Sequence, residues 1–170
     1  ISRTQNNNLI NLKKLPKANY LIYCIKSTNL KKTIKYFEHF KKLLVEKSTM
    51  KIVFFSSGAV YGPSTKKNKF KENQKISIKK INTFVGYKKK YAKEKIILEN
   101  KFKEIANKGF KVSIVRGFTF YGKHILRYNY LISQILRAVK AKSKLVIKNK
   151  NTYRSFMYAD DMCKCLIKIL

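Results

Sequence analysis

Apolar residues along the chain form short runs that alternate with longer segments of helical spacing. The runs are five or six residues long, as is typical of buried strands. They predict strands at Tyr20–Ile25, Lys51–Ser56, Val112–Arg116 and Lys144–Lys148. Apolar residues three and four apart predict helices at Asn29–Lys47, Tyr87–Asn107 and Tyr130–Val139, with a last helix beginning near Asp160.

The order of these elements predicts a doubly wound α/β fold. Strands that alternate with helices form a parallel sheet with helices on both faces, and continuous apolar runs are typical of strands buried on both sides. Gly109 is placed to end the long helix, and the polar segment Pro63–Lys80 is expected to be a loop. Ligands of such sheets bind beyond the carboxyl ends of the strands. Ser56–Tyr61 and Arg116–Gly122 are therefore expected at the active edge.

Composition adds the protein class. The 170 residues, 45% of them hydrophobic and 13% aromatic, fit one globular domain. No stretch approaches the roughly 20 apolar residues of a membrane helix, and the polar start has no signal-peptide layout. The three cysteines, Cys24, Cys163 and Cys165, lack a metal-binding or redox spacing. We interpret them as reduced thiols in a cytoplasmic protein.

The net charge of +32, from 40 basic and 8 acidic residues, raises nucleic acid as a partner. The basic residues are scattered, however, and only five are arginine, the residue that bidentate phosphate and base recognition favours. Lys, Asn and Ile also share AT-rich codons, so compositional drift explains the charge about as well as a partner does. Neither nucleic acid nor a membrane is expected to be the main partner.

Candidate chemistry lies at the end of the second strand and on the long helix. Ser57 follows that strand, where its hydroxyl group can reach a substrate oxygen, although the serines taken alone favour a Ser-Gly turn. Tyr91 and Lys95 lie four residues apart, on one helix face. A neighbouring ammonium group lowers the pKa of a phenol and prepares it for proton transfer. In a chain this rich in lysine, the spacing alone does not establish such a pair.

Four ordered motifs give the pattern its specificity. The first two are Ser56-Ser-Gly-Ala-Val-Tyr-Gly62 and Tyr91-x-x-x-Lys95-x-x-x-Glu99. The others are Val115-Arg-Gly-Phe-Thr-Phe-Tyr-Gly122 and Tyr153-Arg-Ser-Phe-Met-Tyr-Ala-Asp-Asp161. In this order they resemble the extended short-chain dehydrogenase/reductases, in particular the NAD-dependent epimerase/dehydratase family. The resemblance spans roughly residues 18 to 170 and implies a Rossmann-like sheet.

The resemblance also implies residue roles. Ser57, Tyr91 and Lys95 would be catalytic, with Tyr91 as the acid/base of a sugar hydroxyl. Ser56, Tyr91, Lys95 and Arg116 would contact NAD or NADP, with NAD favoured. The substrate, a nucleotide-linked sugar, would meet Ser57, Thr119 and Arg154. No metal site is expected, because His39 and His124 lie far apart without ligand companions.

Two departures from the family pattern narrow the activity. Thr119 stands where the family usually has Asn, which leaves the sugar contacts there open. Gly58 and Ala59 replace the Asp-Glu pair of the sugar-nucleotide 4,6-dehydratases, so water elimination is not expected.

The family's phosphate-binding Gly-x-x-Gly-x-x-Gly turn is not found among the six glycines. We therefore expect an internal fragment: residues 1–17 as a polar connecting segment, and residues 18–170 as a partial cofactor domain with the start of the substrate region at about 117–170. Part of the substrate region is expected to be missing as well.

Three functions remain open: a nucleotide-sugar epimerase, a keto-sugar reductase of the same family, or a non-catalytic scaffold that binds RNA. The joint presence of Ser57, Tyr91 and Lys95 favours an enzyme. A homodimer is implied by the resemblance, and weak or absent NAD binding is expected for these 170 residues alone.

Overall fold

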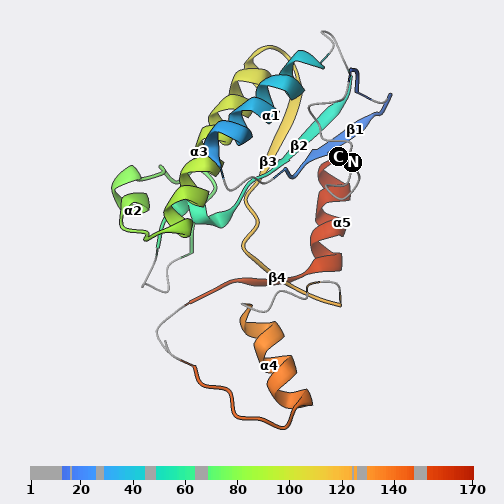
Figure 1. Ribbon diagram of the computed structural model, residues 1–170. Coiled ribbons are helices and arrows are strands. Elements are labelled where there is room, and N and C mark those ends of the chain that lie inside the picture. The colour runs from blue at the N-terminus through green and yellow to red at the C-terminus, as the bar shows by residue number, and fades with distance from the viewer. Residues whose placement is uncertain are drawn as a thin grey trace.

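The computed structural model describes residues 13–15, 17–25, 29–44, 49–63, 69–123, 125, 130–147 and 153–170. Its elements, in chain order, are β1 (Tyr20–Tyr23), α1 (Leu30–Lys42), β2 (Lys51–Phe55), the 3-10 turn η2 (Gly58–Tyr61), α2 (Ile78–Asn82), α3 (Tyr87–Asn107), β3 (Lys111–Val115), β4 (Thr119–Tyr121), α4 (Leu131–Lys140), β5 (Phe156–Tyr158) and α5 (Ala159–Ile169). Figure 1 shows their arrangement.

Two parallel sheets organise these elements. The larger sheet has the strand order β1-β2-β3, with Tyr20 opposite Lys51 and Phe55 opposite Val115. The smaller sheet pairs β4 with β5, and Thr119 lies opposite Phe156. The parallel direction and the alternation of strands and helices confirm the predicted α/β class.

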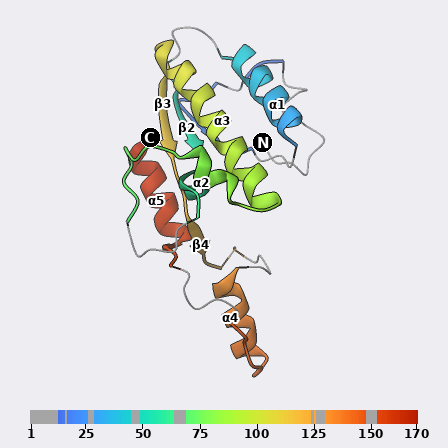
Figure 2. The same cartoon turned by 90° about the vertical axis from the view of Figure 1, so that its left-hand side faces the viewer.

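Helices lie on both sides of the larger sheet. Figure 2 shows α1 and α3 on one side and α5 on the other. Side chains that alternate along β2 explain this division, because Ile52 and Phe54 join the core under α1 and α3 while Val53, also buried, faces the opposite way. At the end of α5, the Lys51 ammonium group donates a hydrogen bond to the carbonyl oxygen of Leu170.

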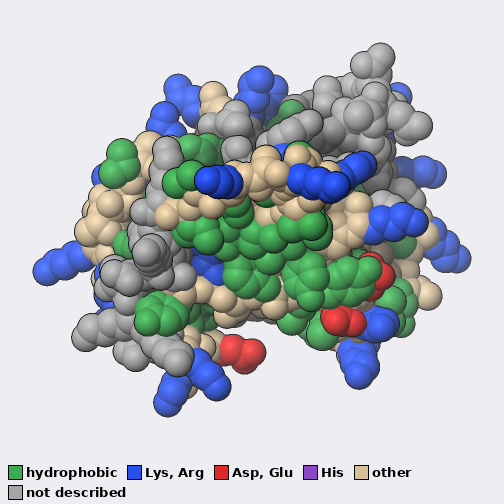
Figure 3. Space-filling view, turned by 90° about the horizontal axis from the view of Figure 1, so that it is seen from below, with side chains coloured by type: hydrophobic (Ala, Val, Ile, Leu, Met, Phe, Trp, Pro, Cys, Tyr) green, Lys and Arg blue, Asp and Glu red, His purple; other side chains and the backbone are tan. Residues whose placement is uncertain are grey.

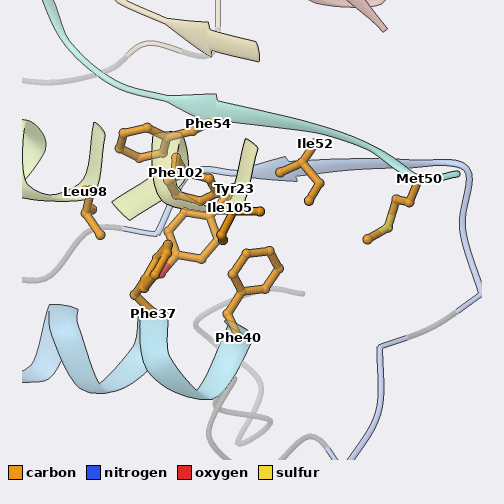
Figure 4. Packing of buried hydrophobic residues seen from close by; sticks show 9 residues of the cluster. All are labelled: Tyr23, Phe37, Phe40, Met50, Ile52, Phe54, Leu98, Phe102 and Ile105. Carbon is orange, nitrogen blue, oxygen red and sulfur yellow. The ribbon is translucent and has the colours of Figure 1, made fainter. Parts of the chain in front are cut away.

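The main hydrophobic core lies between the larger sheet and the pair α1 and α3, as Figure 4 shows. Its centre is a group of aromatic rings at edge-to-face, tilted and stacked angles, and Phe54 and Phe102 stack with centroids 4.5 Å apart. The buried residues of this core are Tyr23, Phe37, Phe40, Met50, Ile52, Phe54, Leu98, Phe102 and Ile105. Their burial fixes the position of α3 relative to β2.

Local signals set the helix boundaries. The side chain of Asn29 accepts a hydrogen bond from the Lys32 amide and caps α1. Helix α3 spans the predicted residues, and Gly109 follows it with φ +90°, a conformation that glycine adopts without strain. Two predicted segments differ. Helix α1 ends at Lys42, and the last residues of the expected loop already form the start of α2, which Ser77 caps by accepting a hydrogen bond from the Lys80 amide.

The predicted strand Lys144–Lys148 is wrong over its described residues, 144–147, which form no strand. Val146 and Ile147 are exposed, and no described strand pairs with them. The strands β4 and β5, three residues each, were not predicted. They are too short for a period of two to be recognised. Lys148 and the predicted continuation of α1 at 45–47 lie outside the described residues. In the part of the chain that the structure describes, no helix is both long and apolar enough to cross a membrane.

Candidate active site

The carboxyl ends of β2 and β3 continue side by side beyond the sheet. The Ser56 amide donates to the carbonyl oxygen of Val115 at 2.7 Å, and the Gly58 amide donates to that of Gly117, also at 2.7 Å. These bonds extend the register of the sheet by three residues and bring two of the four sequence motifs together. The candidate site therefore forms at the predicted edge.

Ser57 lies in this extension and begins η2. Its Oγ accepts a hydrogen bond from the Ala59 amide at 3.2 Å, which is the geometry of an N-cap. The side chain is half-buried. Within the described residues the hydroxyl proton has no acceptor. The same hydroxyl group is thus held in place by one bond and able to donate another.

Aromatic rings pack closely beside Gly58. A Cβ atom at this position would lie 2.5 Å from the ring of Phe118, so only glycine fits there. The rings of Tyr61 and Phe70 stack with centroids 4.7 Å apart, and Phe118 lies parallel to both at 6.2 Å. Ring stacking thus fixes the segment that follows Ser57.

Tyr91 and Lys95 reach the same edge from α3. The Lys95 side chain is buried, and its Nζ donates to the carbonyl oxygen of Phe55 at 2.9 Å, two residues before Ser57. The same Nζ lies 5.9 Å from the centroid of the Tyr91 ring. Tyr87, one turn earlier on α3, stacks on Tyr91 with centroids 5.8 Å apart. The ammonium group therefore lies between the end of β2 and the phenol.

Glu99, one turn after Lys95, is a buried carboxylate with three donors. Ser56 Oγ donates to its Oε1 at 2.6 Å, while Arg116 donates from Nε to Oε1 at 3.0 Å and from Nη2 to Oε2 at 2.8 Å. Arg116 also donates from Nη1 to the Tyr61 hydroxyl at 2.8 Å and to the carbonyl oxygen of Glu72 at 3.1 Å. The hydrogen bond to Glu99 raises the pKa of Arg116, although burial acts in the opposite direction.

The candidate substrate residues lie along the small sheet. Thr119 begins β4, and its amide donates to the carbonyl oxygen of Ser155 at 3.4 Å. Arg154 is the next residue before Ser155 and is exposed. Phe118, which packs against Gly58, immediately precedes Thr119. Backbone hydrogen bonds thus connect the Ser57 segment to the segment of Thr119, and Thr119 to the residue that follows Arg154.

A family model described as "NAD dependent epimerase/dehydratase family" matches residues 17–170. The chain belongs to this family. The four motifs and the family match cover the same part of the sequence, so the predicted family is confirmed.

Several solved structures, two of sugar-nucleotide enzymes among them, share the fold. The dTDP-glucose 4,6-dehydratase of Bacillus anthracis, in complex with NAD, has a TM-score of 0.67 at 17% identity, over 89% of this chain and 47% of its own. The UDP-N-acetylglucosamine 4-epimerase of Methanobrevibacter ruminantium has a TM-score of 0.68 at 20% identity, over 95% and 54%. RMD of Pseudomonas aeruginosa, complexed with NADPH, has a TM-score of 0.70 at 14% identity, over 99% and 62%.

The family member described here spans about half the length of these structures. A search of curated protein sequences finds no match. The structural likeness confirms the predicted Rossmann-like fold. The NAD and NADPH of the solved neighbours agree with the cofactor class expected for the family.

The structure brings Ser57, Tyr91 and Lys95 to one edge, and Thr119 follows on the adjoining strand. The side chains of Ser56 and Arg116 are engaged with Glu99, and the hydrogen bonds of Arg116 account for four of its five N–H groups. Cofactor contacts of these two residues, and substrate contacts of Arg154, stay predictions.

Sequence reasoning assigned no role to Glu99, although its place eight residues after Tyr91 indicates the same helix face. A hollow of about 440 Å³ lies beside this carboxylate's partner Arg116, lined also by Asn73 and Asn100. Neither Ser57 nor Tyr91 lines it, so the hollow is separate from the candidate catalytic residues.

Proposed function

We propose that this chain carries the catalytic residues of an NAD(P)-dependent enzyme that epimerises a nucleotide-linked sugar through a keto intermediate. Tyr91 is the acid/base, Lys95 supports it, and Ser57 binds the reacting oxygen. The proposal rests on the family match and on the convergence of these side chains at one sheet edge.

One observation carries the proposal. The Lys95 ammonium group is buried and anchored to the Phe55 carbonyl oxygen, which fixes it near the Tyr91 ring and two residues from Ser57. A lysine that served only solubility would not be buried, because removing an ammonium group from water is costly unless it is paired. Its position places a positive charge beside the Tyr91 ring at the edge of the sheet.

The side chains then divide the proton transfer. A phenolate on Tyr91, stabilised by the Lys95 charge, takes the proton of a sugar hydroxyl group. The hydroxyl group of Ser57, which donates to no acceptor among the described residues, is available to donate to the same oxygen. When the carbonyl carbon is reduced again from the other face, Tyr91 returns the proton. The two residues thus stabilise both charge states of one oxygen.

The donor set fits a nicotinamide cofactor. Lys95 and Tyr91 would hold its ribose, since an ammonium and a phenol beyond the ends of parallel strands match the hydroxyl groups of a ribose. When bound, the nicotinamide would supply hydride acceptance and return, which no side chain can provide. We further propose that Thr119 contacts the sugar, that Arg154 pairs with the diphosphate, and that the complete protein is a homodimer.

The test is the substitution Tyr91→Phe in the complete protein that contains this chain, assayed with NAD and a panel of UDP- and dTDP-linked hexoses. The expected kcat falls by about 10²–10⁴-fold, because the positioned acid/base is lost. The dissociation constant for NAD is expected to rise only slightly, because Lys95 still holds the ribose. Tyr87→Phe, which alters the stacked neighbouring tyrosine, is the matched control and should retain turnover.

The outcomes separate the candidate functions. Turnover of the hexoses without net change of NAD supports the epimerase, whereas stoichiometric oxidation of NADH or NADPH added together with a nucleotide-linked keto-sugar indicates the keto-sugar reductase. Undiminished activity in Tyr91→Phe would show that the assigned acid/base is wrong. RNA affinity with a steep salt dependence and no turnover would favour the scaffold.

A further inference from the structure

Glu99 is a carboxylate that α3 buries almost completely, with 1% of the residue exposed. It lies four residues after Lys95 and eight after Tyr91, so the three side chains follow one helix face. Unlike the other two, Glu99 faces Ser56 and Arg116, which leave the ends of β2 and β3. One carboxylate therefore joins the helix of the candidate acid/base to two strand ends.

The hydrogen bonds of Glu99 and Arg116 reach both ends of the segment that carries Ser57. On one side, Ser56 Oγ donates to Glu99 Oε1 at 2.6 Å. On the other, Arg116, held by Glu99 in a two-bond fork, donates to the hydroxyl group of Tyr61 at the end of η2 at 2.8 Å. The guanidinium Cζ also lies 5.0 Å from the Tyr61 ring centroid. Both ends of the segment that carries Ser57 thus connect to the same carboxylate.

Stability alone is a weak explanation for this arrangement. Well-packed hydrophobic residues often replace a buried ion pair without loss of stability, because the two charges must leave water. The fork of arginine on carboxylate gives direction as well as attraction. Two of the bonds here lead to Ser56 and Tyr61, at the two ends of the segment that carries Ser57, and a further bond of Arg116 leads to the carbonyl oxygen of Glu72.

We propose that Glu99 and Arg116 are positioning residues that set the distance between Ser57 and the pair Tyr91 and Lys95. They act through Ser56 and Tyr61 and do not touch the reacting atoms. This inference deepens the proposed function and rests on it. The Glu99–Arg116 pair would then support the catalytic geometry in addition to the hydrogen bond from Lys95 to Phe55.

The experiment compares Glu99→Gln with Glu94→Gln in the complete protein with NAD bound. Glutamine keeps the size of Glu99 but cannot accept both bonds of Arg116, since its amide nitrogen is a donor. Glu94 is a second buried carboxylate of α3, close to the Tyr23 side of the core, and controls for the loss of a buried charge. The expected kcat of Glu99→Gln falls by about 100-fold, the loss that a small misplacement of a catalytic group causes.

The accompanying constants identify the cause. For Glu99→Gln, the dissociation constant for NAD and the KM for the nucleotide sugar should stay within about threefold, because the groups proposed to hold the cofactor ribose and the diphosphate remain in place and only Ser57 shifts. Glu99→Asp, which restores the charge, should recover part of the kcat. Ser56→Ala removes one arm and should lower kcat with unchanged NAD affinity. A raised NAD dissociation constant would instead assign Ser56 to the cofactor.

A second readout does not need turnover. Hydrogen exchange of the amides from Ser56 to Tyr61 should become faster in Glu99→Gln and remain at the wild-type rate in Glu94→Gln. Unchanged exchange, or equal kcat losses in the two variants, would overturn the proposal. Should Tyr91→Phe retain full activity, the proposed function fails, and the exchange measurement still decides whether Glu99 holds the Ser57 segment.

Discussion

The helices of this molecule differ in how far they are buried. Helices α1 and α3 bury aromatic and aliphatic side chains against the large sheet, and Phe37, Phe40 and Phe102 are at most 1% exposed. Helix α4 has apolar residues at the same helical spacing, yet none of its residues is buried. Leu136 and Val139 are 64% and 70% exposed. Periodicity therefore identifies the apolar face of a helix, while burial depends on what lies against it.

The difference also separates the two halves of the candidate site. Tyr91, Lys95 and Glu99 are carried by the packed helix α3, which the core fixes against β2. Thr119 and Arg154 belong to the part that includes α4 and the small sheet. On the face seen from below, Figure 3 shows hydrophobic side chains in a broad patch, with Lys and Arg along its upper edge and Asp or Glu at its lower right. The proposed catalytic residues on α3 thus stand on the main core, whereas Thr119 and Arg154 belong to a part of the chain that contributes no residue to it.

The largest expected effect compares the two helices directly. Phe102→Ala should lower the free energy of unfolding by about 3–5 kcal/mol, because a buried ring leaves a cavity in the aromatic core. Leu136→Ala on α4 should change it by no more than about 0.5 kcal/mol, as is usual for exposed positions. Urea unfolding followed by circular dichroism gives both values. A loss of more than about 2 kcal/mol in Leu136→Ala, which is roughly half the largest loss for a buried leucine, would show that α4 packs against another part of the protein.

A smaller effect is expected from a buried polar group in the core. The Tyr23 hydroxyl is buried, and within the described residues it has no hydrogen-bond partner. Burial raises the pKa of this phenol, and the charge of Glu94 raises it further. Tyr23→Phe keeps the ring and removes the unsatisfied group, so the free energy of unfolding should rise by about 1 kcal/mol.

The matched control for Tyr23→Phe lies on the same strand. Tyr20 is 54% exposed, and Tyr20→Phe should leave the stability within about 0.5 kcal/mol of the wild type. Both values come from urea unfolding at one pH. A loss of stability in Tyr23→Phe would instead reveal a hydrogen-bond partner for the hydroxyl group.

The sequence predicted those elements whose signals are local. Helix α3 begins and ends at the predicted residues because its apolar positions and Gly109 are encoded within the segment itself. The run at 144–147 has the composition of a strand but finds no strand to pair with among the described residues. A strand requires a neighbour, and the sequence does not specify one.

The candidate site shows the same limit. Ser57, Tyr91 and Lys95 were found because their motifs occur in a fixed order along the chain. The engagement of Arg116 with Glu99 could not be derived from that order, since it depends on which strand ends the helix crosses. Arg116 was assigned to the cofactor from the family resemblance, and the structure shows which groups surround its guanidinium group.

The smallest expected effect concerns an ion pair that joins the two packed helices. Glu38 of α1 accepts a hydrogen bond from Lys101 of α3 at 2.5 Å, and this bond lowers the pKa of Glu38, with the charges of Lys101, Lys41 and Lys42 adding to it against burial. The Glu38 side chain is 41% exposed, so solvent screens the pair. Its contribution to stability should be below about 1 kcal/mol.

The pH dependence gives this small effect a distinct sign. A carboxylate whose folded pKa is depressed stabilises the protein above its ordinary pKa of 4.5, and the contribution is lost as the pH falls through the folded value. Lys101→Gln should therefore have a lower thermal midpoint than Lys103→Gln near neutral pH, and the two should converge under acid conditions. Lys103 lies on the same helix without a described ion pair, so the control cancels the general relief of positive charge. A difference that persists unchanged into acid would mean that Lys101 acts through its contact with the Phe37 ring, where its Nζ lies 5.3 Å from the centroid.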